Sequence, residues 1–278
     1  MNKYGTYTWF GYTVAFEERL KAIKDAGFDT ICTFWAREMD GIDAPGEYQA
    51  EIADRHGLYL EHSHLPYFNS NIMWNDDIAA TDMRDMYIDG IKRAKRGGLK
   101  TLVIHTCDIY APDMQRYHLF MENMKKVADA AEKYEIRLAV ENLGDNLFLR
   151  NVLDDLKDNP YVGMCFDSGH NNIVAKDDFS LLREYSGRIY ATHIHDNDAV
   201  TDKHILPYSE GCNVDWKKFM EVMSSVDFDG SLMLEASYPI NYDDYDGEND
   251  VEIPNPSYPM ENWLRDAAES CRRIYAEL

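Results

Sequence analysis

Basic residues are scarce in this chain, and no basic cluster points to an anionic partner. Lys and Arg number 28 against 50 Asp and Glu, giving a formal net charge of −22 over 278 residues. The densest basic run, Lys92–Arg96, has the spacing of one helix face. A surface this acidic repels nucleic-acid backbones and anionic membranes. We therefore expect neither nucleic acid nor a membrane as a partner.

Cysteine pairing patterns and export signals are also lacking. The five cysteines are odd in number and none form a Cys-x-x-Cys motif, which is typical of reduced thiols in a cytoplasmic protein. The first residues, Met1–Thr13, lack the charged start and apolar core of a signal peptide. No apolar run approaches the length of a membrane span. These absences predict a cytoplasmic location.

What the chain does have is one repeating unit: a short apolar or β-branched run, a polar loop and a longer stretch with helical spacing. Glycines such as Gly27 and Gly57 close the helices. The expected strands are Tyr4–Tyr7, Thr30–Phe34, Leu58–His64, Thr101–His105, Arg137–Glu141, Val162–Asp167, Ile189–His195 and Ser231–Glu235. The expected helices are Phe16–Ala26, Gly46–His56, Asp77–Arg96, Asp113–Tyr134, Leu147–Lys157, Phe179–Tyr185, Trp216–Ser225 and Pro259–Glu277.

Eight strand–helix units without a linker predict an α/β fold, a single (β/α)₈ barrel formed by one domain over residues 1–278. The rival architecture is an open doubly wound sheet. Its usual Gly-x-Gly-x-x-Gly turn after the first strand is absent. The acidic segment Asn241–Val251 is expected to be a loop before the last helix.

Residues of the types that bind metals stand at the ends of six successive strands. They are His64, His105, Glu141, Asp167, His193 and Glu235. In a barrel, the C-terminal strand ends face the active-site mouth. Strand alternation directs the last four of these toward the barrel axis, and directs their neighbours Val140, Phe166, Ile194 and Leu234 toward the helices.

A buried carboxylate is costly unless it is paired or bound to a metal. Considered alone, Asp167 is typical of a helix cap and His105 of a buried core histidine. The pattern of metal-binding residue types at six successive strand ends favours a metal site. The mixed oxygen and nitrogen donors suit Mn²⁺, Zn²⁺, Co²⁺ or Mg²⁺. Cys165, two residues before Asp167, is expected to fill the barrel interior.

Several segments resemble the xylose isomerase-like TIM barrel superfamily. They are His64–Tyr67, Val140–Asn142, Cys165–His170, His193–Asp198, Asp202–His204 and Leu234–Glu235. The superfamily includes sugar phosphate isomerases and epimerases, ketose 3-epimerases and apurinic endonucleases of the endonuclease-four type. The resemblance covers nearly the whole chain, and it implies a metal-dependent enzyme.

The resemblance also implies which residues bind metal. Glu141, Asp167, His193 and Glu235 match the four ligands of the single metal in the isomerases and epimerases. The endonuclease type holds three metals, and its additional ligands map onto His64, His105, His170, Asp202 and His204, which can alternatively contact substrate. One segment departs from the family: Leu206–Cys212 replaces the common Pro-Gly-x-Gly pattern, so no substrate contact is carried over there.

The function implied by the resemblance is isomerisation or epimerisation of a sugar or sugar phosphate. The metal acts as a Lewis acid that stabilises an enediolate, while Glu141 and Glu235 remove and return the proton. The candidate substrate-binding residues are His195, Lys203, Trp35 and Tyr67.

Three alternatives remain open: a multi-metal phosphodiesterase of the apurinic endonuclease type, an inositol-type dehydratase and a non-catalytic sugar-binding barrel. The net charge of −22 argues against a DNA-facing rim. The complete glutamate pair argues against a barrel that only binds. The sequence does not decide the sugar, its phosphorylation, the metal, or whether the chain forms a homo-oligomer.

Overall fold

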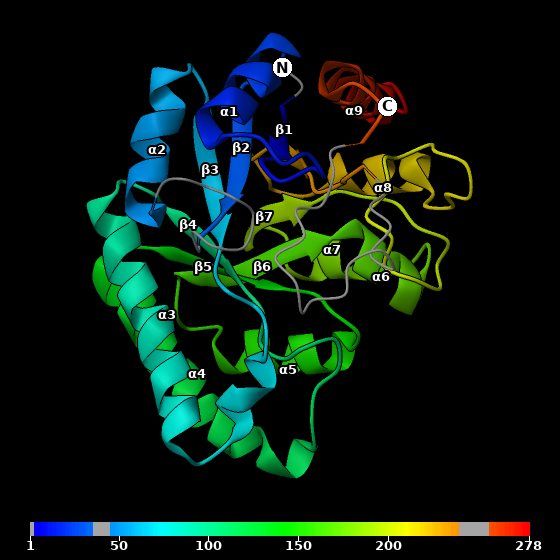
Figure 1. Cartoon of the computed structure of the whole chain (residues 1–278). Coiled ribbons are helices and arrows are strands. Elements are labelled where there is room, and N and C mark those ends of the chain that lie inside the picture. The colour runs from blue at the N-terminus through cyan, green and yellow to red at the C-terminus, as the bar shows by residue number, and fades with distance from the viewer. Residues whose placement is uncertain (1–2, 36–44, 239–255) are drawn as a thin grey trace.

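A computed structural model describes residues 3–35, 45–238 and 256–278 of the chain. Strands ring the centre and helices cover the outside (Figure 1). The strands are β1 (Tyr4–Tyr7), β2 (Thr30–Phe34), β3 (Tyr59–His64), β4 (Thr101–Ile104), β5 (Arg137–Glu141), β6 (Val162–Asp167), β7 (Ile189–His193) and β8 (Leu232–Leu234). The α-helices are α1 (Phe16–Asp25), α2 (Gly46–Arg55), α3 (Ile78–Arg96), α4 (Tyr117–Tyr134), α5 (Asn146–Asp155), α6 (Ser168–Ala175), α7 (Ser180–Glu184), α8 (Trp216–Met223) and α9 (Met260–Tyr275). Two 3₁₀ helices, η1 (Ser70–Trp74) and η2 (Met114–Arg116), precede α3 and α4.

All the strand pairs are parallel, in the order β7-β6-β5-β4-β3-β2-β1-β8. The two ends of this sheet meet just beyond β7, where Ile194 bridges Leu234. The Ile194 N–H donates to Met233 O (2.8 Å), and the Glu235 N–H donates to Ile194 O (2.9 Å). The expected (β/α)₈ barrel is confirmed. Its closure places Glu235 at the same mouth as the ends of β5, β6 and β7.

Two apolar layers fill the barrel and its coat. Val103, Ala139, Cys165 and Ala191 form a small cluster inside the strands. The larger cluster lies between strands and helices, and it holds the residues expected to face outward: Val140, Phe166, Ile194 and Leu234. The alternation predicted from sequence is therefore confirmed, as is the expectation that Cys165 fills the interior.

The structure differs from the sequence expectation mainly at α6. This helix begins directly after β6, and Asp167 caps it by accepting the His170 N–H (2.6 Å). Its eight residues are too few for an apolar period to emerge. The long helix expected from Asp113 begins instead as the 3₁₀ turn η2. The expected acidic loop, Asn241–Val251, lies outside the described residues.

The helix ends follow their sequence signals. Gly27 and Gly57 adopt φ of +95° and +71° just past α1 and α2, a conformation in which a Cβ would be strained. Asp77 and Asp145 cap α3 and α5 through their side chains. Within the described ranges, no helix has the length and apolarity needed to cross a membrane.

Candidate metal centre and pocket

A pocket of about 470 Å³ opens at the C-terminal ends of the strands. Its lining residues are Tyr7, His64, Tyr67, Phe68, Asn69, His105, Asp108, Ile109, Glu141, Leu143, His170, Asp202, His204 and Glu235. Seven of these were predicted as metal or additional-ligand residues from the sequence. No Lys or Arg appears among these lining residues of the described chain.

The floor of the pocket brings the four predicted ligands together. Glu141 ends β5, Asp167 ends β6, His193 ends β7 and Glu235 follows β8. Asp167 and His193 are direct partners in the β6–β7 register. One donor atom from each of the four residues lies within 4.8 Å of the others. Separate strands thus carry the four donors to one point.

The chemistry of this group fits a divalent cation. Glu141 and Asp167 are buried carboxylates, with 2% and 0% of the residue exposed. The Nδ1 atom of His193 lies 2.9 Å from Glu235 Oε2 and 3.2 Å from Glu141 Oε2, yet it forms no hydrogen bond of suitable geometry. Three carboxylates converging on a buried nitrogen repel one another unless a cation lies among them.

The charges at the floor are strongly interdependent. Burial works against ionisation of Glu141, but His193 and His105 outweigh it and hold the pKa of that carboxyl well below its usual range. Burial likewise opposes the charged form of His193, but Cys165, Glu235 and Glu141 raise its pKa well above the usual value. In the metal-free protein a protonated His193 occupies the cationic role, so a metal must displace its proton to bind.

A second group of donors shares Glu141. The Nε2 atoms of His64 and His105 lie 3.1 and 3.3 Å from Glu141 Oε2. His64 ends β3, and His105 follows β4. The three residues form a separate donor set with atoms within 4.8 Å of one another. Burial lowers the pKa of His105 despite Glu141, which favours its neutral, metal-binding form.

A third group, His170, Asp202 and His204, lines the same pocket. Asp202 Oδ2 is 3.2 Å from His170 Nε2 and 3.0 Å from His204 Nε2. Burial disfavours the Asp202 carboxylate, but both imidazoles hold its pKa far below the usual range. Burial also opposes a charged His204, but Asp202 raises its pKa to about 9. This group could hold a further cation in place of its protons.

Asp167 both caps a helix and belongs to the four-residue donor group, two roles that appear as alternatives from the sequence. Its Oδ1 caps α6 by accepting the His170 N–H, and its Oδ2 lies 3.1 Å from His195 Nε2. His195 is fully buried and stacks on His204, with ring centroids 3.9 Å apart. The cap and the imidazole together fix the carboxylate at the pocket floor.

Only one of the four predicted substrate-binding residues lies in the pocket lining. Tyr67 lines it, and His195 lies beneath it against Asp167. Trp35 is 7% exposed and packs outside the pocket, where its ring lies against the backbone of Gly46. Lys203 pairs with Asp198 (2.7 Å) and is also outside the lining. Their role in substrate binding stays a prediction.

Several lining residues were not singled out from the sequence. Tyr7 is the last residue of β1, so the rule that strand ends face the mouth would have found it. Asn69, Asp108, Ile109 and Leu143 come from loops without regular spacing, and only the fold brings them to the pocket.

Comparisons with known proteins agree with this architecture. An uncharacterized protein of Sinorhizobium fredii, y4fM, is 27% identical over 151 residues, which are 50% of this chain and 48% of the relative. The chain thus spans about half the length of that relative. The crystal structure of a D-tagatose 3-epimerase-like protein superposes with a TM-score of 0.74 at 19% identity, covering 99% of this chain and 96% of the other.

Two further structures have the same fold. D-Allulose 3-epimerase from Methylomonas sp., in complex with D-allulose, gives a TM-score of 0.73 at 18% identity, covering 99% of this chain and 97% of the other. An AP endonuclease, family 2, from Brucella melitensis gives 0.69 at 17% identity, covering 88% and 99%. A family model matches residues 20–274. The chain belongs to the xylose isomerase-like TIM barrel family.

Proposed function

We propose that this protein is a divalent-metal-dependent epimerase or isomerase of a sugar, with Glu141 and Glu235 as the proton-transferring residues. The observation that carries the proposal is the convergence of Glu141, Asp167, His193 and Glu235 at the floor of the pocket. Similarly folded structures named as sugar 3-epimerases support the same substrate class.

The positions of the two glutamates suit proton transfer at one carbon. Glu141 ends β5 and Glu235 follows β8, so β6 and β7 separate their strands around the barrel. This separation of their strands supports approach of the two carboxylates from different sides of a bound sugar. A base that removes a proton from one face and an acid that returns one to the other face would invert the carbon. Return of the proton to the neighbouring carbon would isomerise the sugar.

The residues of the site would have separate roles in this chemistry. Glu141, Asp167, His193 and Glu235 would hold the metal, which when bound supplies a Lewis acid for the substrate carbonyl and neighbouring hydroxyl. In the metal-free protein, His193 pulls down the pKa of Glu235 against the effect of burial, so this carboxylate is ionised there. Tyr67 and Phe68 line one wall and offer ring faces to the sugar.

The absence of Lys and Arg from the described pocket lining favours an uncharged sugar over a sugar phosphate. A phosphate group is usually met by Arg, Lys or a metal ion. In this pocket the remaining cationic groups are His170 and His204, which are already engaged with Asp202.

A second candidate function is hydrolysis of a phosphodiester by several metal ions. The observation in its favour is that three donor groups line one pocket: His64 and His105 with Glu141, the four-residue group, and His170 with Asp202 and His204. Several cations could bind a phosphate without any Lys or Arg. The net charge of −22 opposes a long nucleic acid as substrate.

Metal counting combined with a substrate panel distinguishes the two functions. The metal-loaded protein is analysed for bound Mn²⁺, Zn²⁺ and Co²⁺ per chain and assayed on free ketoses, ketose phosphates and a duplex with one abasic site. Conversion of a ketose is expected for the epimerase or isomerase. Cleavage of the duplex, without action on any ketose, would replace the first proposal by the second.

A matched pair of variants assigns the metals to their groups. His204→Ala removes a donor from the third group, and His105→Ala removes one from the group that shares Glu141. For an epimerase or isomerase with one metal, both variants should keep that metal. A three-metal site should lose about one metal in each variant.

A further inference from the structure

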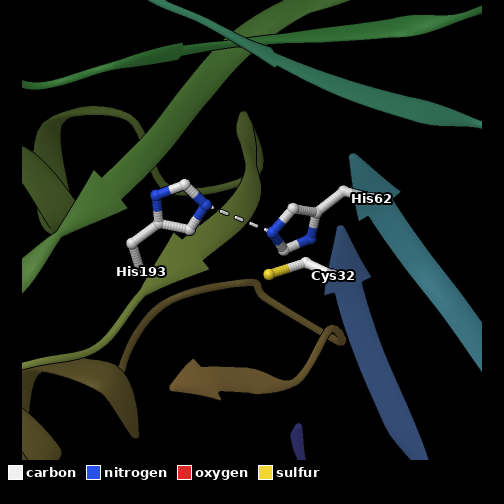
Figure 2. Close-up of side chains that lie close together, drawn as sticks. All are labelled: Cys32, His62 and His193. Atoms are coloured by element: carbon white, nitrogen blue, oxygen red, sulfur yellow. Dashed lines mark hydrogen bonds between the residues drawn. The ribbon is translucent and has the colours of Figure 1, made fainter. Parts of the chain in front are cut away.

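Beneath the pocket floor, three inward-facing side chains meet inside the barrel. Cys32 extends from β2, His62 from β3 and His193 from the end of β7, and Figure 2 shows them converging. All three are buried, with 2%, 0% and 1% of the residue exposed. Neither Cys32 nor His62 lines the pocket. The proposed proton-transfer chemistry uses neither residue.

His193 faces two different environments with its two nitrogens. Its Nδ1 is directed at the carboxylates of Glu235 and Glu141, at 2.9 and 3.2 Å. Its Nε2 lies 3.3 Å from Nε2 of His62 (Figure 2). Nδ1 is therefore the His193 nitrogen that would bind a metal, and His62 is the partner of Nε2.

The chemistry of imidazole determines what His62 must do. When a metal takes the lone pair of Nδ1, the remaining ring proton of His193 is on Nε2. That N–H then points at His62 Nε2, which must be unprotonated to accept it. A neutral imidazole has one such nitrogen. His62 would therefore carry its own proton on Nδ1.

The surroundings of His62 make it an acceptor. Its ring is 0% exposed, and its Nε2 lies within hydrogen-bond distance of His193 Nε2, at 3.3 Å. Its Nδ1 has no hydrogen-bond partner among the described residues. The contact between the two Nε2 atoms is therefore the polar contact through which His62 can act on the His193 ring.

We propose that His62 is a positioning residue that accepts a hydrogen bond from Nε2–H of His193 and so presents Nδ1 of His193 to the metal. This inference rests on the proposed metal site. Metal-binding histidines are commonly held by a carboxylate, a carbonyl or a water at the second nitrogen, and loss of such a partner typically costs 10- to 100-fold in metal affinity. Here a buried imidazole takes that place.

The cluster could instead be an inner metal site, because Cys32, His62 and His193 offer donors within 4.8 Å of one another. Two imidazole nitrogens on one tetrahedral zinc would also lie about 3.3 Å apart, given Zn–N bonds of about 2.0–2.1 Å. Neither Cys32 nor His62, however, lines the pocket through which a metal would enter. An inner metal would also take Nε2 of His193 and leave the proton on Nδ1, facing Glu235.

The experiment measures metal affinity and imidazole protonation in the full chain. Dissociation constants for Mn²⁺ and Co²⁺ are determined by competition with a chelator in the unsubstituted protein, His62→Leu, His62→Gln and Cys32→Ala. Leu removes the acceptor at similar size, whereas Gln supplies an oxygen near the same place. We expect about 10- to 100-fold weaker binding in His62→Leu. His62→Gln should recover most of the affinity, and Cys32→Ala should change it little.

Nitrogen-15 chemical shifts of the two imidazoles provide a readout that a purely structural role would not change. In the protein loaded with diamagnetic Zn²⁺, His62 should show a protonated Nδ1 and an unprotonated Nε2, and His193 a protonated Nε2. These shifts test the inference even where His62→Leu fails to fold. A protonated Nε2 on His62 in the loaded protein overturns it.

The other outcomes separate the inference from the function on which it rests. Unchanged affinity in a folded His62→Leu protein overturns the role of His62 and leaves the metal site intact. A thiolate-to-cobalt charge-transfer band that disappears in Cys32→Ala would show an inner metal site instead, and would also overturn it. If the unsubstituted protein binds no divalent metal, the proposed function fails, and the role of His62 fails with it.

Discussion

Replacing Glu141 or Glu235 singly by Gln tests the proton-transfer proposal most directly. Gln keeps the size and one oxygen of the side chain but cannot take up a proton at neutral pH. A positioned general acid or base contributes about 10²- to 10⁴-fold to the rate, equivalent to about 2.7–5.5 kcal/mol. We expect a loss in kcat of that size for each variant.

The two variants should differ in metal binding because their carboxylates have different contacts. Oε2 of Glu141 lies within 3.3 Å of nitrogens on His64, His105 and His193. Among the ion pairs of the described residues, the Glu235 carboxylate takes part only in the one with His193. Glu141→Gln should therefore weaken metal binding as well as lower kcat. Glu235→Gln should lower kcat with a smaller loss of metal affinity.

The assay follows deuterium uptake from D₂O into candidate ketoses by mass spectrometry, with metal content measured on the same samples. Glu61→Gln is the matched control, since Glu61 is another largely buried glutamate on a barrel strand. It lies outside the pocket, and its carboxylate accepts the Ser231 hydroxyl (2.7 Å). Exchange at the unsubstituted rate in metal-loaded Glu141→Gln and Glu235→Gln proteins would refute the two-glutamate mechanism.

Four further outcomes are expected. Gly169→Ala should weaken metal binding at least tenfold, because its Cβ would lie 1.9 Å from the fully buried His195 ring; unaltered affinity by chelator competition would contradict this. Metal at 100 times its dissociation constant should stabilise the fold by about 2.7 kcal/mol, raising Tm by about 5–10 °C, and a chelator should reverse this. Asp202 raises the pKa of His204 from 6.5 to about 9. The pairing therefore stabilises the metal-free protein fully below pH 6.5, and this stabilisation is lost as the pH rises through 9. The Tm should fall over that pH range, and it should fall less in Asp202→Asn. Phe166→Ala should lower the free energy of unfolding by about 3–5 kcal/mol in a urea titration, because the ring is fully buried between Phe179 and Phe219.

The eight strand–helix units and the inward direction of Glu141, Asp167, His193 and Glu235 could be predicted from the sequence. The reason is local: side chains alternate along a strand with a period of two, and the C-terminal ends of barrel strands meet at one mouth. A polar residue that ends an apolar strand therefore reveals its direction without any knowledge of the partner strands. The apolar neighbours Val140 and Phe166 do pack toward the helices.

The contacts made by each ring and carboxylate depended on the tertiary structure. Trp35 and Lys203 stand near strand ends in sequence, yet the fold directs one against Gly46 and pairs the other with Asp198. His62 lies on the same strand as His64, yet it is absent from the pocket lining and lies 3.3 Å from His193. Sequence spacing specifies only the direction in which a side chain leaves its own strand. The partner it meets is determined by the loops and by barrel closure and register, which bring His62 to His193 across 131 positions.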